Sequence, residues 1–123
     1  MRCSFEAEVR SVCYRCHKPE VTCICSDLRR VHNRTPVWVV QHPRERFHPL
    51  GTTRIARLGL ENVRVEVVRR GASTPPTLPS GAALLYPGPQ ARELDSLPPH
   101  ERPEALVVID GTWAHAHTLY RDN

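Results

Sequence analysis

The stretch 105–110, ALVVID, is followed directly by 111–123, GTWAHAHTLYRDN. An uninterrupted run of leucine, valine and isoleucine is typical of a strand that is buried on both faces, as in a parallel sheet. A strand this apolar is usually central, and the residues after it begin like a helix. The stretch therefore predicts the central strand of an α/β sheet. Because little sequence remains to cover that strand, we expect a chain truncated at its C-terminus.

Three further apolar runs lie upstream, at 37–40, 63–68 and 82–86, and the starts of the four runs are about twenty residues apart. The run at 63–68 differs from the others, because Arg64 and Glu66 alternate with its valines. This alternation indicates one exposed face. The spacing predicts a mostly parallel sheet whose strands alternate with flanking helices.

Two of the intervals have helical patterns. In 53–60, Ile55 and Leu58 form a short apolar stripe. In 90–97, apolar residues recur at positions 91, 94 and 97. We therefore expect crossover helices in both segments.

The composition is that of a soluble globular protein, with 123 residues of which 40% are hydrophobic and 24% charged. No stretch approaches the roughly 18–20 apolar residues that span a bilayer. The first residues lack the apolar core of a signal peptide. We expect a cytoplasmic protein without a membrane partner, and no obligate protein partner is evident from the sequence.

The charge is distributed unevenly along the chain. Residues 1–70 contain 14 Lys and Arg against 7 Asp and Glu, a net of +7, and residues 71–123 contain 3 against 6, a net of −3. Lys18 is the only lysine among the 17 basic residues. Since the guanidinium fork suits phosphate, a basic N-terminal half fits RNA as a partner. An ordinary solvated surface rich in arginine is the alternative.

Four cysteines occur in 13–25, CYRCHKPEVTCIC, as a CxxC pair and a CxC pair. Two tight pairs can supply four thiolates to a tetrahedral zinc ion. The predicted ligands of a structural zinc are Cys13, Cys16, Cys23 and Cys25, in an N-terminal lobe at 1–34. His17 could replace one ligand, and Arg15 and Lys18 could offset the excess negative charge. Reduced cysteines without metal and a redox-active CxxC are the alternatives, and Cys3 is left over as a free thiol.

The tetrapeptide DGTW, residues 110–113, lies where the last predicted strand ends. Ligands of open α/β sheets bind at the carboxyl ends of strands, where Asp110 would sit. Gly111 permits a tight turn, Thr112 can cap the following helix, and Trp113 offers a stacking face. A turn or cap role for Asp110 and a core position for Trp113 are the alternatives.

The ordered set CxxCxxP…CxC, QHPRE, TTRIARLGL, LLYP and DGTW resembles the DTW-domain family from about residue 10 to the end of the chain. The resemblance implies a SPOUT-like α/β fold, in which part of the chain threads a trefoil knot. It also implies tRNA-uridine aminocarboxypropyltransferase activity with S-adenosylmethionine as donor. His117 departs from the family pattern, which usually has a basic residue nearby. Because the knotted C-terminal part is absent, residues 35–123 are expected to form an incomplete catalytic domain. We therefore expect enzyme activity of the longer parent protein and not of this fragment.

The implied reaction moves the 3-amino-3-carboxypropyl group to N3 of a uridine and releases 5′-methylthioadenosine. Asp110 is the candidate base for the N3–H, because its strand-end position combines partial burial with access to the crevice. Orienting the turn or binding the substrate amino group is the alternative role of Asp110. The candidate cofactor-binding residues are Tyr86, Pro87, Asp110, Gly111, Thr112 and Trp113.

The candidate RNA-binding residues are His42, Arg44, Glu45, Arg54 and Arg57. One or two of these arginines would clamp RNA phosphates or the substrate carboxylate. The structural alternatives are a solvated face, a packed His42, a half-buried Tyr86, and a Glu45 that pairs with Arg46 or Arg54. Two other functions also fit the sequence: a non-catalytic zinc-containing RNA-binding module, and a SPOUT-type RNA methyltransferase.

Overall fold

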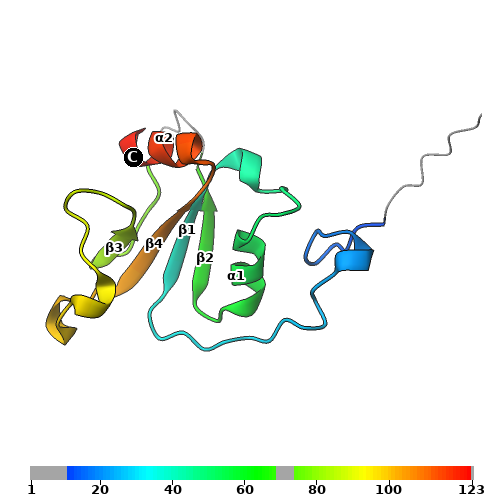
Figure 1. Ribbon diagram of the computed structural model, residues 1–123, viewed down its shortest axis with the longest axis horizontal. Coiled ribbons are helices and arrows are strands. Elements are labelled where there is room, and N and C mark those ends of the chain that lie inside the picture. Colours follow the sequence, from blue (N-terminus) through cyan, green and yellow to red (C-terminus); the bar gives the residue numbers. More distant parts are fainter. Residues whose placement is uncertain (1–10, 69–73, 123) are drawn as a thin grey trace, which may run out of the picture.

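The computed structural model describes residues 11–68 and 74–122, so the predicted free thiol Cys3 lies outside the described residues. A four-stranded sheet in the order β2-β1-β4-β3 forms the centre of the molecule (Figure 1). Its strands are β1 (Val37–Gln41), β2 (Val63–Val67), β3 (Ala82–Leu85) and β4 (Ala105–Asp110). All three pairings are parallel. The α/β fold class and the four predicted strands are therefore confirmed.

The most apolar strand, β4, lies inside the sheet between β1 and β3. Ala105 and Val107 of β4 are buried, as is Val39 of β1. By contrast, β2 is an edge strand, which explains why its sequence tolerates charged residues. Arg64 of β2 is exposed and places its guanidinium 4.9 Å from the centre of the Trp38 ring.

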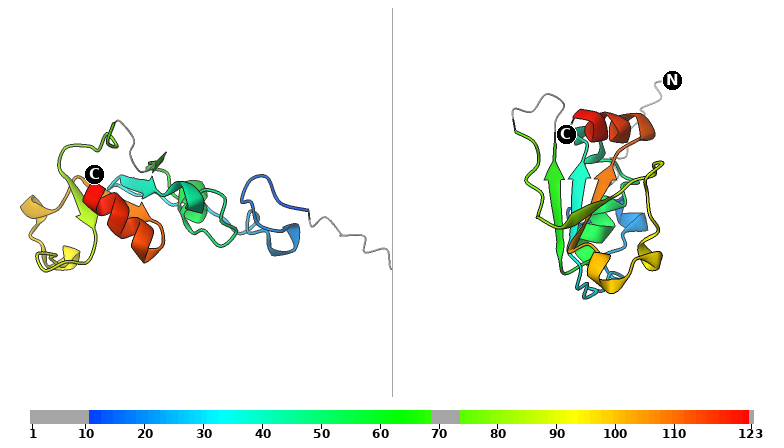
Figure 2. Two further views of the ribbon diagram at one scale, coloured as in Figure 1. Left: turned by 90° about the horizontal axis from the view of Figure 1, so that it is seen from above. Right: turned by 90° about the vertical axis from the view of Figure 1, so that its left-hand side faces the viewer.

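Two α-helices accompany the sheet. The predicted helix at 53–60 is confirmed as α1 (Thr53–Gly59), which lies beside β2 (Figure 1). The second helix, α2 (Trp113–Asp122), crosses the carboxyl end of the sheet (Figure 2). Leu119 of α2 is buried with Val40, Val68 and Val107, and this cluster forms the hydrophobic core. The helix that follows DGTW thus covers the edge at which the strands end.

The predicted helix at 90–97 is wrong. The structure has two 3-10 helices in this region, Leu94–Ser96 and Pro99–Glu101. Prolines at 87, 89, 98 and 99 bracket the segment, and proline removes a backbone donor and restricts the residue before it. The few residues between them cannot offset the cost of nucleating a helix. Leu94 is accordingly 38% exposed instead of packed.

Residues 11–34 form a lobe beside α1, away from the sheet (Figure 1). The ring of His17 stacks on Phe47, with centroids 6.1 Å apart, and Lys18 Nζ donates to the Pro49 carbonyl at 3.3 Å. A second attachment lies at the end of the lobe, where Asn33 and Asn62 exchange hydrogen bonds. The cysteine segment is therefore docked onto the domain at two places. Within the described part of the chain, no helix has the length and apolarity to cross a membrane.

Candidate functional site

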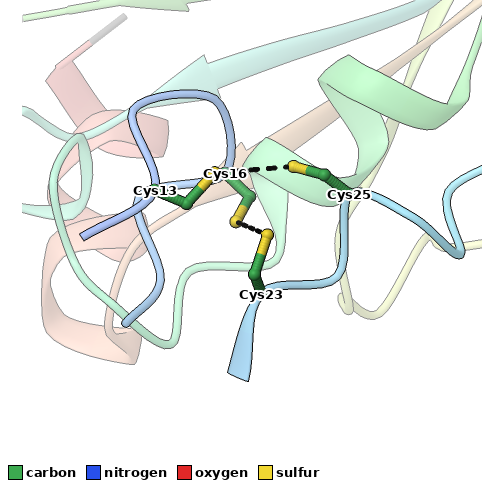
Figure 3. Close-up of side chains that lie close together, drawn as sticks. All are labelled: Cys13, Cys16, Cys23 and Cys25. Carbon is green, nitrogen blue, oxygen red and sulfur yellow. Dashed lines mark hydrogen bonds between the residues drawn. The ribbon is translucent and has the colours of Figure 1, made fainter. Parts of the chain in front are cut away.

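The four cysteine thiols of the N-terminal lobe converge on one point, as Figure 3 shows. Their sulfur atoms all lie within 4.8 Å of one another. The Cys13 and Cys25 sulfurs are 3.8 Å apart, and those of Cys16 and Cys23 are 3.7 Å apart. Four sulfurs about 2.3 Å from a tetrahedral zinc ion would be roughly 3.8 Å from one another. Because these separations are far longer than the ~2.05 Å of a disulfide, the geometry fits a metal centre.

The local backbone arranges these thiols. A tight turn closes the first pair, with the backbone N–H of Cys13 donating to the Lys18 carbonyl at 2.9 Å and His17 in the left-handed region at φ 57°. The backbone N–H of Lys18 lowers the pKa of Cys16 to about 6, which favours the thiolate that binds metal. Burial and the neighbouring thiols raise the pKa of Cys25 to about 12. A cation among the four sulfurs would offset the negative charge that four neighbouring thiolates bring together.

The predicted alternative ligand His17 is not one of the residues that converge on this point. Its ring packs against Phe47 instead. Among the described residues, the cluster is made of the four cysteines alone, as the spacing of the two pairs predicted.

A second constellation joins three elements at the carboxyl end of the sheet. Asp110 ends β4 directly opposite Gln41 of β1. The Asp110 Oδ2 atom accepts hydrogen bonds from Gln41 Nε2 at 2.8 Å and from Thr53 Oγ1 of α1 at 2.7 Å. Gln41 and Thr53 are the buried polar residues of the described chain, at 6% and 8% exposure. Asp110 therefore satisfies two buried donors and ties α1 to the sheet.

Gln41 and Thr53 were not among the predicted site residues. The sequence features that could have pointed to them are a polar residue at the end of an apolar run and a threonine at the start of the TTRIARLGL segment. Neither residue type indicates a site by itself.

The turn after Asp110 is tightly packed. A Cβ atom on Gly111 would lie 3.0 Å from the Cβ of His115 and 3.5 Å from that of His42, so a side chain here would have to displace its neighbour by a few tenths of an ångström. The Thr112 hydroxyl accepts from the backbone N–H of His115 at 3.4 Å, as expected of a cap. Trp113 is 76% exposed, so the alternative of a core position for it is wrong. Its ring is available for stacking.

A histidine pair packs beside this turn. The rings of His42 and His115 are stacked, with centroids 3.9 Å apart and planes within 5°. Burial lowers the pKa of His42, and the charges of His115 and Arg44 lower it further. The Nδ1 atom of His115 is buried without a hydrogen-bond partner among the described residues, and the nearest carboxylate oxygen of Glu45 is 3.9 Å away. Among the described residues neither Arg46 nor Arg54 forms an ion pair with Glu45, so the alternative of a surface ion pair for Glu45 does not hold.

A groove of about 600 Å³ lies between the Pro43–Glu45 turn, α1 and the β2 edge. Its lining includes Arg46, Arg54, Arg57, Arg64, Glu45 and Phe47. The Phe47 ring is 64% exposed, with the Arg46 guanidinium 5.1 Å from its centre. His17 of the cysteine lobe also lines the groove. The groove is therefore cationic and has an aromatic wall.

The structure brings some of the predicted RNA-binding residues together and separates others. Glu45, Arg54 and Arg57 line the groove. Arg44 is exposed and outside this lining, and His42 is half-buried in the histidine stack.

The predicted cofactor-binding residue Tyr86 is half-buried, and its ring stacks on Tyr120 at 4.8 Å. β3 ends at Leu85 opposite Val108, so Tyr86 follows the strand near the carboxyl end of β4 while its ring packs on α2. A cofactor-binding role for Tyr86 and Pro87 stays a prediction.

Comparison with known proteins identifies the family of the chain. The family described as the DTW domain matches residues 10–123. The chain belongs to the DTW-domain family. A protein of Macaca fascicularis named tRNA-uridine aminocarboxypropyltransferase 2 is 32% identical over 129 residues, which cover 95% of this chain and 43% of that protein.

More distant relatives carry similar names. The Drosophila melanogaster protein named tRNA-uridine aminocarboxypropyltransferase 2 is 30% identical over 90% of this chain and 49% of its own length. The Arabidopsis thaliana protein named tRNA-uridine aminocarboxypropyltransferase A is 29% identical over 91% of this chain and 51% of its own length. The chain thus spans about half the length of these curated relatives. No solved structure matches it significantly.

Proposed function

We propose that the natural protein containing this chain is a tRNA-uridine aminocarboxypropyltransferase. It would move the 3-amino-3-carboxypropyl group of S-adenosylmethionine to N3 of a uridine and release 5′-methylthioadenosine. The observation that carries this proposal is the match to the DTW domain over residues 10–123, with relatives named for this transfer. The cationic groove that reaches the carboxyl end of the sheet supports a nucleic-acid substrate.

The reacting groups would meet at the carboxyl end of the sheet. Residues 110–113 would hold the donor, whose sulfonium makes the adjacent carbon susceptible to attack by the uridine nitrogen. The exposed Trp113 ring offers a stacking surface there. Holding nitrogen and carbon in line is a proximity effect, which can contribute several kcal/mol to lowering the barrier.

A base role for Asp110 stays a prediction, and a substitution tests it. Oδ2 is already occupied by Gln41 and Thr53, so Oδ1 is the oxygen left for a substrate proton. If Asp110 is the base, Asp110→Asn should lower turnover by about 10²–10⁴-fold with little change in S-adenosylmethionine binding. Near-normal turnover would leave Asp110 a positioning role only.

RNA would lie along the groove. Arg54 and Arg57, which line the groove, would contact phosphates, and the exposed Phe47 ring could stack on a base. The cysteine lobe, which we assign to residues 1–34, would form one wall of this binding surface through His17, with residues 35–123 carrying the chemistry.

Zinc is the metal that best fits the lobe, because four thiolates at tetrahedral separations are its typical structural ligands. Cys13, Cys16, Cys23 and Cys25 would hold it. A four-thiolate site has no open position for a substrate, so the zinc would stabilise the lobe and take no part in the transfer.

The test is incubation of the natural full-length protein with unmodified tRNA and S-adenosylmethionine. We expect release of 5′-methylthioadenosine and a uridine heavier by one aminocarboxypropyl group, detected by mass spectrometry of the digested tRNA. A product heavier by one methyl group, with release of S-adenosylhomocysteine, would instead identify a methyltransferase. Binding of tRNA without either product would identify a non-catalytic RNA-binding module.

A further inference from the structure

Glu45 is the one acidic side chain among the described residues that line the groove, which otherwise carries four arginines. Its side chain is only 17% exposed. A carboxylate in a groove for a polyanion repels phosphates. Within the groove the Glu45 carboxylate therefore suits a hydrogen-bond donor of a ligand better than a phosphate.

His115 fixes the state of this carboxylate from behind. The carboxylate and an unprotonated Nδ1 are both acceptors, and they face each other at 3.9 Å. A proton on Nδ1 would make this contact an attractive ion pair, at a separation too long for a hydrogen bond. The Glu45 carboxylate thus lies between the groove and the His115 ring.

His42 completes the arrangement. Its Nδ1 accepts from the backbone N–H of Arg44 at 3.3 Å, and its ring lies 3.9 Å from that of His115. Two charged imidazolium rings at this distance would repel each other, so the stack carries at most one charge. The other charged groups at this place are Arg44 and Asp110, and the Asp110 carboxylate is turned to Gln41 and Thr53. Glu45 is therefore the carboxylate that lies nearest the His115 Nδ1 atom.

We propose that Glu45, held by His115, accepts a hydrogen bond from the N3–H of uracil and so selects uridine in the groove. This inference rests on the proposed function and deepens it. Uracil presents a donor at N3, whereas cytosine presents an acceptor there, and the carboxylate would repel that acceptor. With cytosine, the Glu45 carboxylate and the N3 atom would be two facing acceptors with no proton between them. Such a mismatch of hydrogen-bonding groups discriminates strongly between the two bases. Asp110 Oδ2 holds the sheet to α1 at the same edge.

The test compares binding of three pentanucleotides to the natural full-length protein: pentauridylate, pentacytidylate, and pentauridylate with a 3-methyluridine at its centre. The wild-type protein should bind pentauridylate about tenfold more tightly than either of the others, as one charged hydrogen bond predicts. Glu45→Gln should reduce both preferences to about twofold or less, because the amide can both accept and donate. Glu61→Gln is the matched control, since it removes one negative charge from an exposed site that pairs with His32, and it should keep the preferences of the wild-type protein.

His115→Phe separates positioning from folding. It keeps a ring for the stack on His42 and removes the buried Nδ1, so thermal stability should not fall while the uridine preference does. Equal affinity of the wild-type protein for the three oligonucleotides, or no measurable binding of any of them, would overturn the inference. So would an unchanged preference in Glu45→Gln. A uridine preference that depends on Glu45, in a protein that transfers no aminocarboxypropyl group, would overturn the proposed function and leave the inference standing.

Discussion

Asp110→Ala tests whether Asp110 holds the carboxyl end of the sheet together. The substitution removes the acceptor of two hydrogen bonds, from Gln41 Nε2 at 2.8 Å and from Thr53 Oγ1 at 2.7 Å. Both donors belong to buried residues, and each would lose its carboxylate partner. A buried donor left without a partner costs about 1–3 kcal/mol. The two donors together predict a loss of about 2–6 kcal/mol in the free energy of unfolding.

Such a loss is large against the 5–15 kcal/mol that stabilises a typical domain. Urea unfolding followed by circular dichroism measures it. Asp110→Asn keeps an acceptor oxygen and should lose much less. In the double variant Asp110→Ala with Thr53→Val, one orphaned donor is absent, so the double variant should be more stable than the sum of the single losses implies, by about 1–2 kcal/mol. A loss below about 1 kcal/mol for Asp110→Ala, or strict additivity in the double variant, would refute the locking role.

The remaining predictions concern the metal, the RNA and the turn. Protein prepared without chelator should carry about one zinc per chain by elemental analysis, and Cys13→Ser or Cys23→Ser should lower metal content and stability together; metal-free wild-type protein would contradict the zinc assignment. Binding of tRNA should weaken steeply with salt, and Arg54→Ala, in the groove, should lower the slope of log affinity against log salt by about one. Arg44→Ala, outside the groove, serves as its control, and equal slopes in the two variants would remove the groove from the interface. Gly111→Ala should destabilise the fold by about 1–3 kcal/mol, because its Cβ would meet His115 at 3.0 Å, and an unfolding midpoint like that of the wild-type protein would show that the turn can relax.

Local patterns in the sequence predicted most of the fold. The four apolar runs became four strands, and the most apolar of them, β4, is internal. The charged residues of 63–68 predicted an exposed face, and β2 is the edge strand. These patterns succeed because burial acts on each strand separately. The pattern at 90–97 failed because apolar spacing cannot overcome prolines at both ends.

Spacing likewise predicted the cysteine cluster, because residues a few positions apart must lie close together whatever the rest of the chain does. The sequence also marked the DGTW turn. It could not place the partners of Asp110, since Gln41 and Thr53 are 69 and 57 residues away along the chain. Only the parallel register of β1 with β4, and the position of α1, bring the three side chains together.

The same holds for Glu45 and His115. In the sequence Glu45 stands beside arginines and is equally compatible with an ordinary surface ion pair, and His115 belongs to a segment without a motif. The tertiary structure turns Glu45 into the groove and sets His115 behind it, because α2 crosses the carboxyl end of the sheet next to the turn that follows β1. The sequence by itself determined which segments form strands and where a metal fits. Contacts between distant segments decide which side chains face one another across the site. Only the folded chain specifies these contacts.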